Sequence, residues 1–495
     1  MLKKILIANR GEIAMRILRA CRELGIKTVA IYSDIDEWSP HVLAADESFP
    51  LGGSLSKDSY LRLDKIIDIA KKSGADAIHP GYGFLAENPL LSAACAKNKI
   101  IFIGPSADSM EKIGDKINAR LLATKIKVPT VPGIYKPLTE DGDLGHILKT
   151  VGLPLAVKAS AGGGGKGMRI VRHAKDLRHS IKEARSEAKA AFGNDIVYAE
   201  KYIESPRHIE MQVLADSSGN TVYLGERECS IQRRHQKLIE ESPSPFVDAE
   251  LRAKMGETAC KIARAVGYAN AGTVEFLVDN KKNFYFLEVN ARLQVEHPVT
   301  EMVTGIDLVK EQIRIASGEK LRFSQDNIRI RGAAIECRIN AENPYDGFTP
   351  SIGEISGVEE PHGPFTRVDS TIEPGMKITM FYDPLMAKLI TWGNNRAEAI
   401  ERMKRALKEY KIVGIHTVIP FHIEILKHPK FLKGDFNTHF IEKEFKFTPS
   451  SGRDAREAAM IAAALEYCRK RKETPVFTTK TSDGWKKASF AENKR

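Results

Sequence analysis

A stretch near residue 290 combines residue types that could do chemistry on a small anion. Residues 288–298 read Glu-Val-Asn-Ala-Arg-Leu-Gln-Val-Glu-His-Pro, with polar and apolar residues alternating. On a β-strand this alternation places the polar residues on one face, and they are Glu288, Asn290, Arg292, Gln294 and Glu296. A carboxylate and an amide can hold a hard cation, an arginine can bind a small oxyanion, and a second carboxylate can take a proton. The row predicts chemistry on phosphate or carbonate; the alternative is a strand with a solvated polar face.

A glycine-rich loop is the second candidate. Residues 161–167 read Ala-Gly-Gly-Gly-Gly-Lys-Gly and join two expected strands. Ordering successive glycines costs backbone entropy, which a close approach of backbone N–H groups to phosphates would offset. The loop is not a Walker A motif, because Gly167 stands where Ser or Thr should follow the lysine. A flexible hairpin tip is the alternative. Lys158, on the preceding strand, could reach an α- or β-phosphate.

Two carboxylates are expected to face each other across a hairpin. Strands expected at 272–279 and 284–295 flank a turn, and counting out from that turn brings Glu275 and Glu288 nearly opposite. Carboxylates that close repel unless a cation lies between them. With Asn290 nearby, the oxygen-rich set suits Mg²⁺ bridging nucleotide phosphates. A surface charge cluster is the alternative, which the apolar flanking residues disfavour.

Two further polar segments have weaker signals. Residues 200–203, Glu-Lys-Tyr-Ile, end an expected strand whose backbone could read a purine edge. Residues 230–237, Ser-Ile-Gln-Arg-Arg-His-Gln-Lys, form a basic cluster without the interleaved aromatic residues that nucleic-acid binding favours. An anion site that uses Lys237 and a plain charged surface remain the two interpretations of this cluster.

The elements that must position these residues fall into three units. Strands expected at 4–8, 28–32, 77–79 and 100–103 alternate with helices such as 12–24, which predicts a parallel α/β sheet. From about residue 107, strands expected at 155–158, 168–172, 196–201, 209–215 and 221–228, with helices at 176–190 and 249–266, predict an α+β unit with antiparallel sheet. A third unit has strands expected at 332–339, 365–369 and 386–391 and a helix at 396–409. A last helix is expected at 454–470, before a basic, polar end.

Composition sets broad limits. The 495 residues suggest roughly three domains, with 42% hydrophobic and 28% charged residues, as in globular proteins. The net charge of +11 is unevenly spread, because residues 451–495 hold eleven Lys and Arg against six Asp and Glu. The remaining charge over the larger body does not demand a nucleic-acid partner. The six cysteines are scattered with no Cys-x-x-Cys pair, which favours reduced thiols in the cytoplasm. Polar residues interrupt the N-terminus too early for a signal peptide, and no run is long enough to span a membrane.

Taken together, these motifs resemble the biotin carboxylase family, ATP-grasp enzymes that carboxylate biotin on a carrier protein. The resemblance runs from residue 1 to about 447, and its motifs lie at 4–14, 79–84, 161–167, 227–237, 288–297 and 382–388. Residues 295–301, Val-Glu-His-Pro-Val-Thr-Glu, are very specific, whereas the glycine loop alone is not. The resemblance implies an ATP-grasp fold, α/β plus α+β. A Rossmann-like, pre-ATP-grasp parallel α/β domain would cover residues 1–106. An ATP-grasp domain would cover 107–325, with a glycine-rich lid at about 130–205. A C-terminal α+β domain would cover 326–447, and a basic extension would cover 448–495.

The family also implies a role for each matching residue. ATP phosphates would contact Lys116, Lys158, Gly164 and Gly165, while the adenine would contact Glu200, Lys201 and Ile203, and the ribose and phosphates would lie near His208, Gln232 and His235. Mg²⁺ or Mn²⁺ would bind Glu275, Glu288 and Asn290. Bicarbonate would bind Lys237, Arg292, Gln294 and Val295, and Glu296 would deprotonate it. Carboxyphosphate would then form and break down, and phosphate would take the biotin N1 proton. Arg292 would stabilise the ureido oxygen, and Arg338 and Tyr82 would place biotin.

The partners follow from the same resemblance. The extension after residue 450 is similar to those of separate biotin carboxylase subunits, especially the A subunit of two-subunit pyruvate carboxylases. No Ala-Met-Lys-Met biotin-attachment site is present, so the biotin carrier or biotinylated carboxyltransferase subunit is expected on another chain, with pyruvate preferred over acetyl-CoA as final acceptor. A cytoplasmic homodimer without nucleic-acid or membrane partners is expected. The alternatives are another carboxyphosphate-forming ATP-grasp ligase, disfavoured by the single lid, and an inactive nucleotide-binding scaffold, disfavoured by the joint presence of Lys237, Arg292, Glu296 and Arg338.

Overall fold

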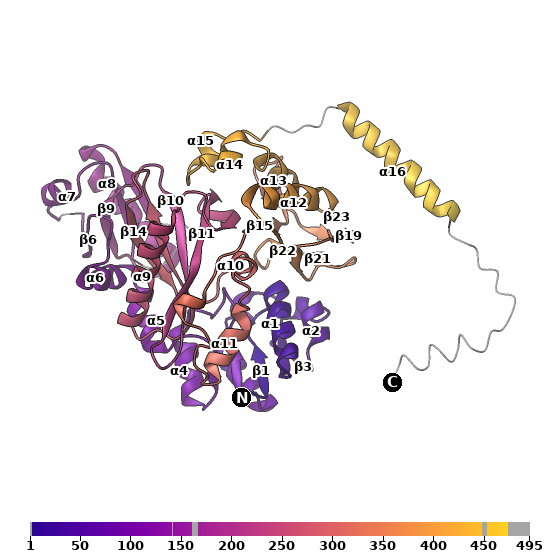
Figure 1. Cartoon of the computed structure of the whole chain (residues 1–495), viewed down its shortest axis with the longest axis horizontal. Helices are drawn as coiled ribbons and strands as arrows, with labels where there is room; N and C mark the ends of the chain where they lie inside the picture. Colours follow the sequence, from indigo (N-terminus) through magenta and orange to yellow (C-terminus); the bar gives the residue numbers. More distant parts are fainter. Residues whose placement is uncertain (1, 141, 161–166, 448–452, 474–495) are drawn as a thin grey trace. The chain divides into compact units, whose positions relative to one another are not determined.

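The computed structural model describes residues 2–140, 142–160, 167–447 and 453–473 (Figure 1). The chain divides into two units, residues 1–446 and 447–495. The second unit contains α16 (Arg453–Glu473), which covers the helix predicted at 454–470. Four large apolar side chains of α16 are exposed, namely Met460, Ile461, Leu465 and Tyr467. No helix in the described part of the chain is long and apolar enough to cross a membrane.

The first unit begins with a five-stranded parallel sheet, as the alternation of strands and helices predicts. Its order is β3-β2-β1-β4-β5, formed by β1 (Lys4–Ile7), β2 (Lys27–Tyr32), β3 (Glu47–Pro50), β4 (Ala77–His79) and β5 (Ile101–Phe102). Side chains alternate between the two faces of β1. Ile5 packs with α1 (Gly11–Glu23) and α11 (Leu308–Ala316), whereas Leu6 packs with α3 (Leu63–Ser73) and α4 (Pro89–Lys97). Helices therefore cover both faces of this sheet.

An eight-stranded antiparallel sheet forms the centre of the first unit. Its order is β14-β13-β10-β11-β12-β15-β22-β20, and its strands are β10 (Arg207–Ala215), β11 (Thr221–Arg233), β12 (Gln236–Ser242), β13 (Asn270–Val278), β14 (Phe284–Asn290), β15 (Ala333–Asn340), β20 (Thr366–Ser370) and β22 (Leu385–Gly393). Because β12 pairs with β15, the sheet continues across residue 326, where a domain boundary is predicted.

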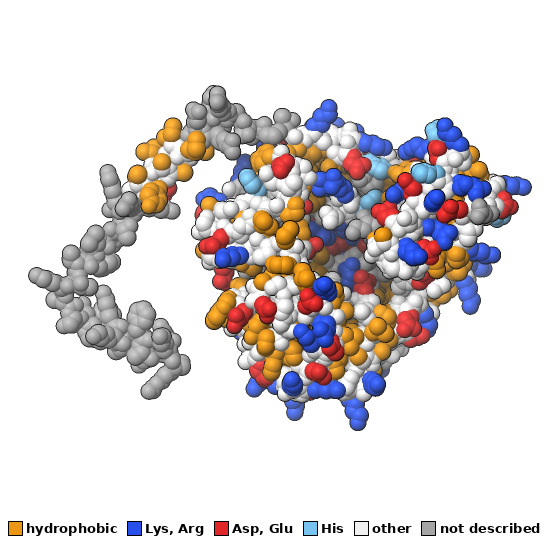
Figure 2. Space-filling view, turned by 180° about the vertical axis from the view of Figure 1, so that it is seen from behind, with side chains coloured by type: hydrophobic (Ala, Val, Ile, Leu, Met, Phe, Trp, Pro, Cys, Tyr) orange, Lys and Arg blue, Asp and Glu red, His pale blue; other side chains and the backbone are white. Residues whose placement is uncertain are grey.

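A smaller sheet lies within the segment predicted as a lid. It has the order β6-β9-β7-β8 and contains β6 (Gly133–Ile134), β7 (Leu155–Ala159), β8 (Met168–Val171) and β9 (Val197–Lys201). It packs with α7 (Leu144–Val151) and α8 (Leu177–Phe192) around a core of its own. Figure 2 shows the surface hollowed between this lobe and the rest of the first unit, with charged side chains gathered in the hollow.

The remaining elements surround these sheets. The helices are α2 (Pro40–Ala44), α5 (Ala107–Gly114), α6 (Lys116–Lys125), α9 (Ala249–Ala265), α10 (His297–Thr304), α12 (Arg396–Glu409), α13 (Ile419–Ile425), α14 (Pro429–Lys433) and α15 (Phe440–Lys443), with short 3-10 turns at Asp34–Asp36, Ser56–Asp58, Ala174–Asp176 and Gln325–Asn327. Two-stranded pairs join β16 (Glu342–Asn343) to β17 (Thr349–Pro350), β18 (Gly353–Glu354) to β21 (Lys377–Ile378), and β19 (Gly357–Glu359) to β23 (Lys411–Val413). Asp248 and Asn395 cap α9 and α12 through their side-chain oxygens.

The observed strand β14 is shorter than the strand predicted at 284–295. β14 ends at Asn290, residues 291–296 form an irregular loop, and α10 begins at His297. Pro298 in the first turn of α10 fits a helix start. Arg292, Gln294 and Glu296 therefore do not share a strand face with Glu288 and Asn290, and the loop must bring them to the site by tertiary contacts.

Candidate active site

Lys237 lies at the centre of the side chains predicted to act together. It is on β12, and its Nζ contacts carboxylate oxygens of Glu210, Glu275 and Glu296 at 2.6, 3.0 and 2.7 Å. Burial alone would lower the pKa of Lys237, but these carboxylates raise it well above its ordinary value. Lys237 therefore remains a cation and can bind an anion. Glu210 has no assigned role in the sequence analysis.

Glu296 is placed as a buried carboxylate between two cations. It is the residue before α10, and it is only 2% exposed. Its Oε1 accepts from Lys237, and its Oε2 accepts from Nη2 of Arg338 at 2.9 Å. Burial would raise the pKa of Glu296, but Lys237, Arg338 and Arg227 hold it well below its usual range. Glu296 is therefore ionised at neutral pH and able to accept a proton.

Arg338 joins Glu296 to a second, more protected acid. From β15 its Nε donates to Oε1 of Glu240 at 2.6 Å. Glu240 on β12 lies opposite Glu336 on β15, and both are fully buried. Burial is the main cause that raises the pKa of Glu240 to about 7, and it raises that of Glu336 well above its ordinary value. Sequence patterns missed both acids, although an acid within an apolar central strand is a signal in itself.

A buried arginine fixes Gln294. Arg227 on β11 is fully buried, and its Nη2 donates to Oε1 of Gln294 at 2.6 Å. Its other donors bind Glu210, Gln212, Thr273 and Thr300. Gln294 in turn donates from Nε2 to Oε1 of Glu275 at 2.8 Å. The central strands thus hold the loop after β14, which explains how Gln294 reaches the site without a strand.

Arg292 is held by the N-terminal part of the chain. Its Nε donates to Oε2 of Glu87 at 2.8 Å and its Nη2 donates to Oδ1 of Asn290 at 2.9 Å. Glu87 also accepts from the backbone N–H of Ala291 at 2.9 Å. Glu87 lies 205 residues before Arg292, and its part was not predicted. The Arg292 side chain is partly exposed, which leaves it accessible to a small anion.

The predicted metal ligands are brought together. Glu275 and Glu288 are directly opposite in the β13–β14 pairing, as predicted, and Asn290 donates from Nδ2 to Oε1 of Glu275 at 2.9 Å. In this structure Lys116 lies 3.1 Å from Glu288 and His208 lies 3.0 Å from Glu275. Two carboxylates and a carboxamide oxygen form a donor set that suits Mg²⁺. His208, Glu210 and Glu275 also offer ligand atoms within 4.8 Å of one another.

A second group of predicted residues lies at the small sheet. Lys158 on β7 contacts Glu200 on β9 at 2.5 Å, and Arg120 on α6 contacts the same carboxylate at 3.0 Å. Burial would raise the pKa of Glu200, but Arg120 and Lys158 lower it. Glu200 is therefore an ionised anchor for two cations. Gly164 and Gly165 lie outside the described residues.

Four further predicted residues are placed less directly. Gln232 pairs with Lys237 in the β11–β12 register, which places it beside the central cation. His235 lies in the turn between these strands, and burial lowers its pKa. Lys201 donates from Nζ to the carbonyl of Leu153 at 2.6 Å, and Ile203 follows β9. Among the described residues, His235, Lys201 and Ile203 have no hydrogen bond or ion pair to the network around Lys237.

Val295 and Tyr82 lie against another buried lysine. The carbonyl of Val295 accepts from Nζ of Lys388 at 3.0 Å, and the same Nζ lies 5.6 Å from the centre of the Tyr82 ring. The Tyr82 hydroxyl is buried and has no hydrogen-bond partner among the described residues. The structure thus places both residues near β22, which carries Lys388.

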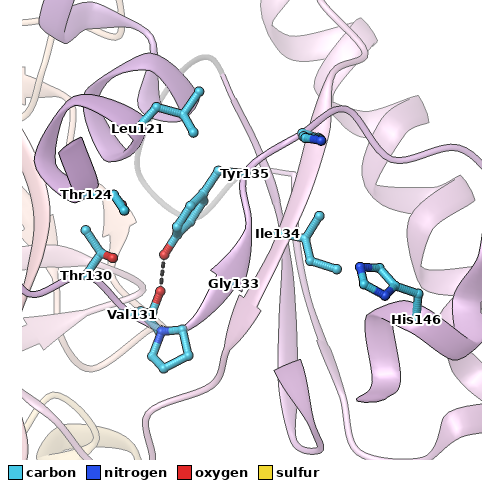
Figure 3. A pocket seen from close by; sticks show the side chains of 10 residues that line it. Leu121, Thr124, Thr130, Val131, Gly133, Ile134, Tyr135 and His146 are labelled. Atoms are coloured by element: carbon cyan, nitrogen blue, oxygen red, sulfur yellow. Dashed lines mark hydrogen bonds between the residues drawn. The ribbon is translucent and has the colours of Figure 1, made fainter. Parts of the chain in front are cut away.

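Two described cavities lie apart from these residues. One of about 450 Å³ is lined by residues of α6, β6 and α7, and Figure 3 shows the Tyr135 hydroxyl directed at the carbonyl of Val131. Another of about 550 Å³ is lined by residues between 10 and 40 and between 371 and 386. The residues lining them include none of the predicted site residues. The candidate site is instead the charged cluster on the central sheet.

Family models match three consecutive segments between residues 1 and 443. The model described as biotin carboxylase, N-terminal domain, matches residues 1–110, and the biotin carboxylase C-terminal domain matches 336–443. The chain belongs to the biotin carboxylase family. Residues 115–324 match the carbamoyl-phosphate synthase L chain, ATP binding domain. That shared ATP-binding domain explains why another carboxyphosphate-forming ligase was a reasonable alternative.

Individual relatives agree with this family. The chain is 54% identical over 443 residues to the A subunit of pyruvate carboxylase from Methanothermobacter thermautotrophicus, covering 90% of each chain. It is 55% identical over 443 residues to biotin carboxylase 1 of Bacillus subtilis, covering 89% of this chain and 98% of the relative. The crystal structure of the biotin carboxylase domain dimer of Hydrogenobacter thermophilus 2-oxoglutarate carboxylase, with MgADP, ADP and bicarbonate, matches with a TM-score of 0.88 and 49% identity over 91% of this chain and all of that chain.

The predicted fold and reaction are confirmed. The chain has the ATP-grasp biotin carboxylase fold, and it is a ligase that uses ATP, Mg²⁺ and bicarbonate to carboxylate biotin. Relatives of the chain are named as a biotin carboxylase and as a subunit of pyruvate carboxylase.

Proposed function

We propose that this chain catalyses the first half-reaction of a two-subunit pyruvate carboxylase and carboxylates biotin carried by a separate protein chain. Support comes from the relative named as the A subunit of pyruvate carboxylase, which matches over 90% of both chains. Acetyl-CoA carboxylation is the second candidate, because chains named only biotin carboxylase are equally similar. A homodimer is the proposed assembly, since a neighbouring structure is described as a dimer.

The nucleotide lies between the small sheet and the central sheet in this proposal. Lys116, Lys158, Gly164 and Gly165 bind its phosphates, while the adenine contacts Glu200, Lys201 and Ile203, and the ribose and phosphates lie near His208, Gln232 and His235. The pairing of Lys158 with the ionised Glu200 supports this arrangement, because it fixes a cation on the small sheet. The lid excludes water from reactive intermediates.

The metal site uses Glu275, Glu288 and Asn290. When bound, Mg²⁺ or Mn²⁺ neutralises phosphate charge and stabilises charge that develops during phosphoryl transfer. The direct register of Glu275 and Glu288 supports the assignment. Lys116 and His208 contact these carboxylates in this structure, at the place where a metal would bind.

The observation that carries the proposed mechanism is the carboxylate of Glu296 between Lys237 and Arg338. Bicarbonate binds Lys237, Arg292, Gln294 and the Val295 backbone, and Glu296 takes its proton. The resulting anion attacks the γ-phosphate of ATP, which gives carboxyphosphate and ADP. Because bicarbonate is a poor electrophile, this phosphorylation supplies the leaving group for the next step.

Biotin binds next to the same cations. Carboxyphosphate breaks down to CO₂ and phosphate, and phosphate removes the proton from biotin N1. Arg292 stabilises the developing charge on the ureido oxygen, while Arg338 and Tyr82 position biotin. The partial exposure of Arg292 supports a role at the open side of the site.

Reconstitution tests this proposal. ADP release is measured with Mg²⁺, ATP and bicarbonate, with and without free biotin, and then with the partner chain that carries biotin and the carboxyltransferase, plus pyruvate or acetyl-CoA. Biotin stimulation that disappears without bicarbonate is expected, and oxaloacetate formation would identify pyruvate as the acceptor. ADP release that is independent of biotin would contradict the proposed half-reaction. Malonyl-CoA formation would favour the second candidate.

A further inference from the structure

Lys388 has an ammonium group in the interior of the protein. Its side chain is 0% exposed, and it projects from β22. The Nζ donates to the carbonyl of Val295 at 3.0 Å, and it lies 3.3 Å from Glu12 and 3.7 Å from Asp369. A buried charge is costly unless other groups compensate it. These contacts therefore account for the position of the ammonium group.

The partners of Lys388 come from separate parts of the fold. Glu12 is in the first turn of α1, Asp369 is on β20, and Val295 is in the loop before α10. The ring of Tyr82, which follows β4, lies 5.6 Å from the ammonium, a distance at which a cation is attracted to an aromatic face. Lys388 thus links the central sheet, the N-terminal α/β sheet and the loop that carries Glu296.

The two carboxylates near Lys388 differ in their other partners. The pKa of Asp369 is far below its usual range despite its burial, because Arg367 and Lys388 lower it. Burial raises the pKa of Glu12 to about 7, and neither of its carboxylate oxygens accepts a hydrogen bond from the described residues. Glu12 is thus the nearer carboxylate to Lys388, at 3.3 Å, whereas Asp369, at 3.7 Å, is also paired with Arg367.

The sheet register places Lys388 directly beside Arg338. The two residues are opposite each other in the β15–β22 pairing, where like charges repel unless they have separate partners. Arg338 donates to the carboxylate of Glu296, whereas Lys388 donates to the carbonyl of the preceding residue, Val295. Two neighbouring cations of one sheet thus hold consecutive residues of the loop.

The loop needs this anchor because regular structure does not fix it. β14 ends at Asn290 and α10 begins at His297, so the Val295 carbonyl has no partner strand. Lys388 supplies a hydrogen-bond donor to this carbonyl instead. Rotation of this peptide would redirect the side chain of Glu296, because the two groups share one backbone segment.

We propose that Lys388 is a positioning residue that fixes the Val295–Glu296 peptide and the Tyr82 ring. It sets the direction of the Glu296 carboxylate through the Val295 backbone, without touching substrate. This inference rests on the proposed role of Glu296 as the base for bicarbonate.

Lys388→Met tests the inference because it keeps the length of the side chain but removes the donor. The kcat/KM for bicarbonate is expected to fall at least tenfold, and the KM for ATP is expected to stay within threefold, since Lys158 and Glu200 are untouched. A merely structural role would not separate these two constants. Lys388→Met with kcat/KM for bicarbonate within twofold of wild type would overturn the inference, as would parallel losses for ATP and bicarbonate.

Two companion variants keep the result interpretable. Lys388→Met combined with Glu12→Gln also removes the buried carboxylate nearest to Lys388, while Asp369 keeps its pair with Arg367, so it serves if the single variant does not fold, and the same bicarbonate defect is expected. Glu12→Gln keeps the Lys388–Val295 hydrogen bond and is expected to retain kcat/KM for bicarbonate within threefold. An equal defect in Glu12→Gln would show that the whole junction, not this hydrogen bond, matters, and would overturn the inference.

Glu296→Gln separates this inference from the mechanism on which it rests. If the Glu296→Gln enzyme is active, Glu296 is not the base, and the mechanism on which the inference rests is wrong. An inactive Glu296→Gln enzyme together with a fully active, folded Lys388→Met enzyme would leave the base in place and overturn only the role of Lys388.

Discussion

Replacement of Glu296 by glutamine removes the proposed base with little change in volume. The carboxylate oxygens accept from Lys237 at 2.7 Å and from Arg338 at 2.9 Å. The glutamine amide presents one oxygen and one NH₂ group, and the NH₂ group must face a cation that has no acceptor to offer. Both cations also lose a counter-charge. The substitution therefore removes proton acceptance and one of the two hydrogen bonds.

The expected loss follows from the role of a general base. Such a group contributes about 10²–10⁴-fold to the rate, which corresponds to roughly 3–5 kcal/mol of activation free energy. We expect kcat/KM for bicarbonate to fall by about 10³-fold, within that range. Binding of ATP should change little, because the contacts between Lys158 and Glu200 are not altered.

The assay is ADP release with Mg²⁺, bicarbonate and free biotin, with ATP binding measured separately by calorimetry. Glu241→Gln is the matched control, because Glu241 is also a buried glutamate that pairs with an arginine, Arg396, at 2.5 Å. Its substitution is expected to lower stability and to leave kcat/KM for bicarbonate within threefold. A Glu296→Gln enzyme with more than a tenth of wild-type kcat/KM would refute the assignment of the base.

Other predictions follow from the same cluster and from the buried histidines. Glu288→Gln removes one of two opposed carboxylates and should raise the Mg²⁺ concentration for half-maximal activity at least fivefold, measured by metal titration of ADP release. Arg227→Met leaves Glu210 without its buried guanidinium partner and should lower the free energy of unfolding by about 3–5 kcal/mol in urea titrations. A loss below about 1 kcal/mol would contradict a stabilising role for the Arg227 hydrogen bonds. Burial lowers the pKa of His41 and of His422 to about 4, below the unfolded value near 6.5. The unfolded chain therefore binds more protons between pH 4 and 6.5, so stability should rise with pH across this window and fall by about 2 kcal/mol per histidine from pH 6.5 to 5; His422→Gln should flatten that dependence.

Local patterns predicted much of the fold. The parallel order of the N-terminal sheet follows from alternating strands and helices. Counting from the short turn brings Glu275 and Glu288 nearly opposite, and a register shift between Glu275 and Phe276 makes them directly opposite. The alternation over 284–295 misled the strand prediction, because alternation also occurs where a strand ends. Pro298 was the local sign of the helix that follows.

The amino-acid sequence by itself determined the family and the central chemistry, and it predicted which residue acts as the base. These conclusions depend on residue types at fixed spacing. Only the tertiary structure decided which side chains hold them. Glu87 lies 205 residues from Arg292, Glu240 lies 98 from Arg338, and Lys388 lies 93 from Val295. Such residues come into contact because sheet pairing and helix packing bring distant segments together. The hydrophobic periodicity within one segment does not predict these contacts.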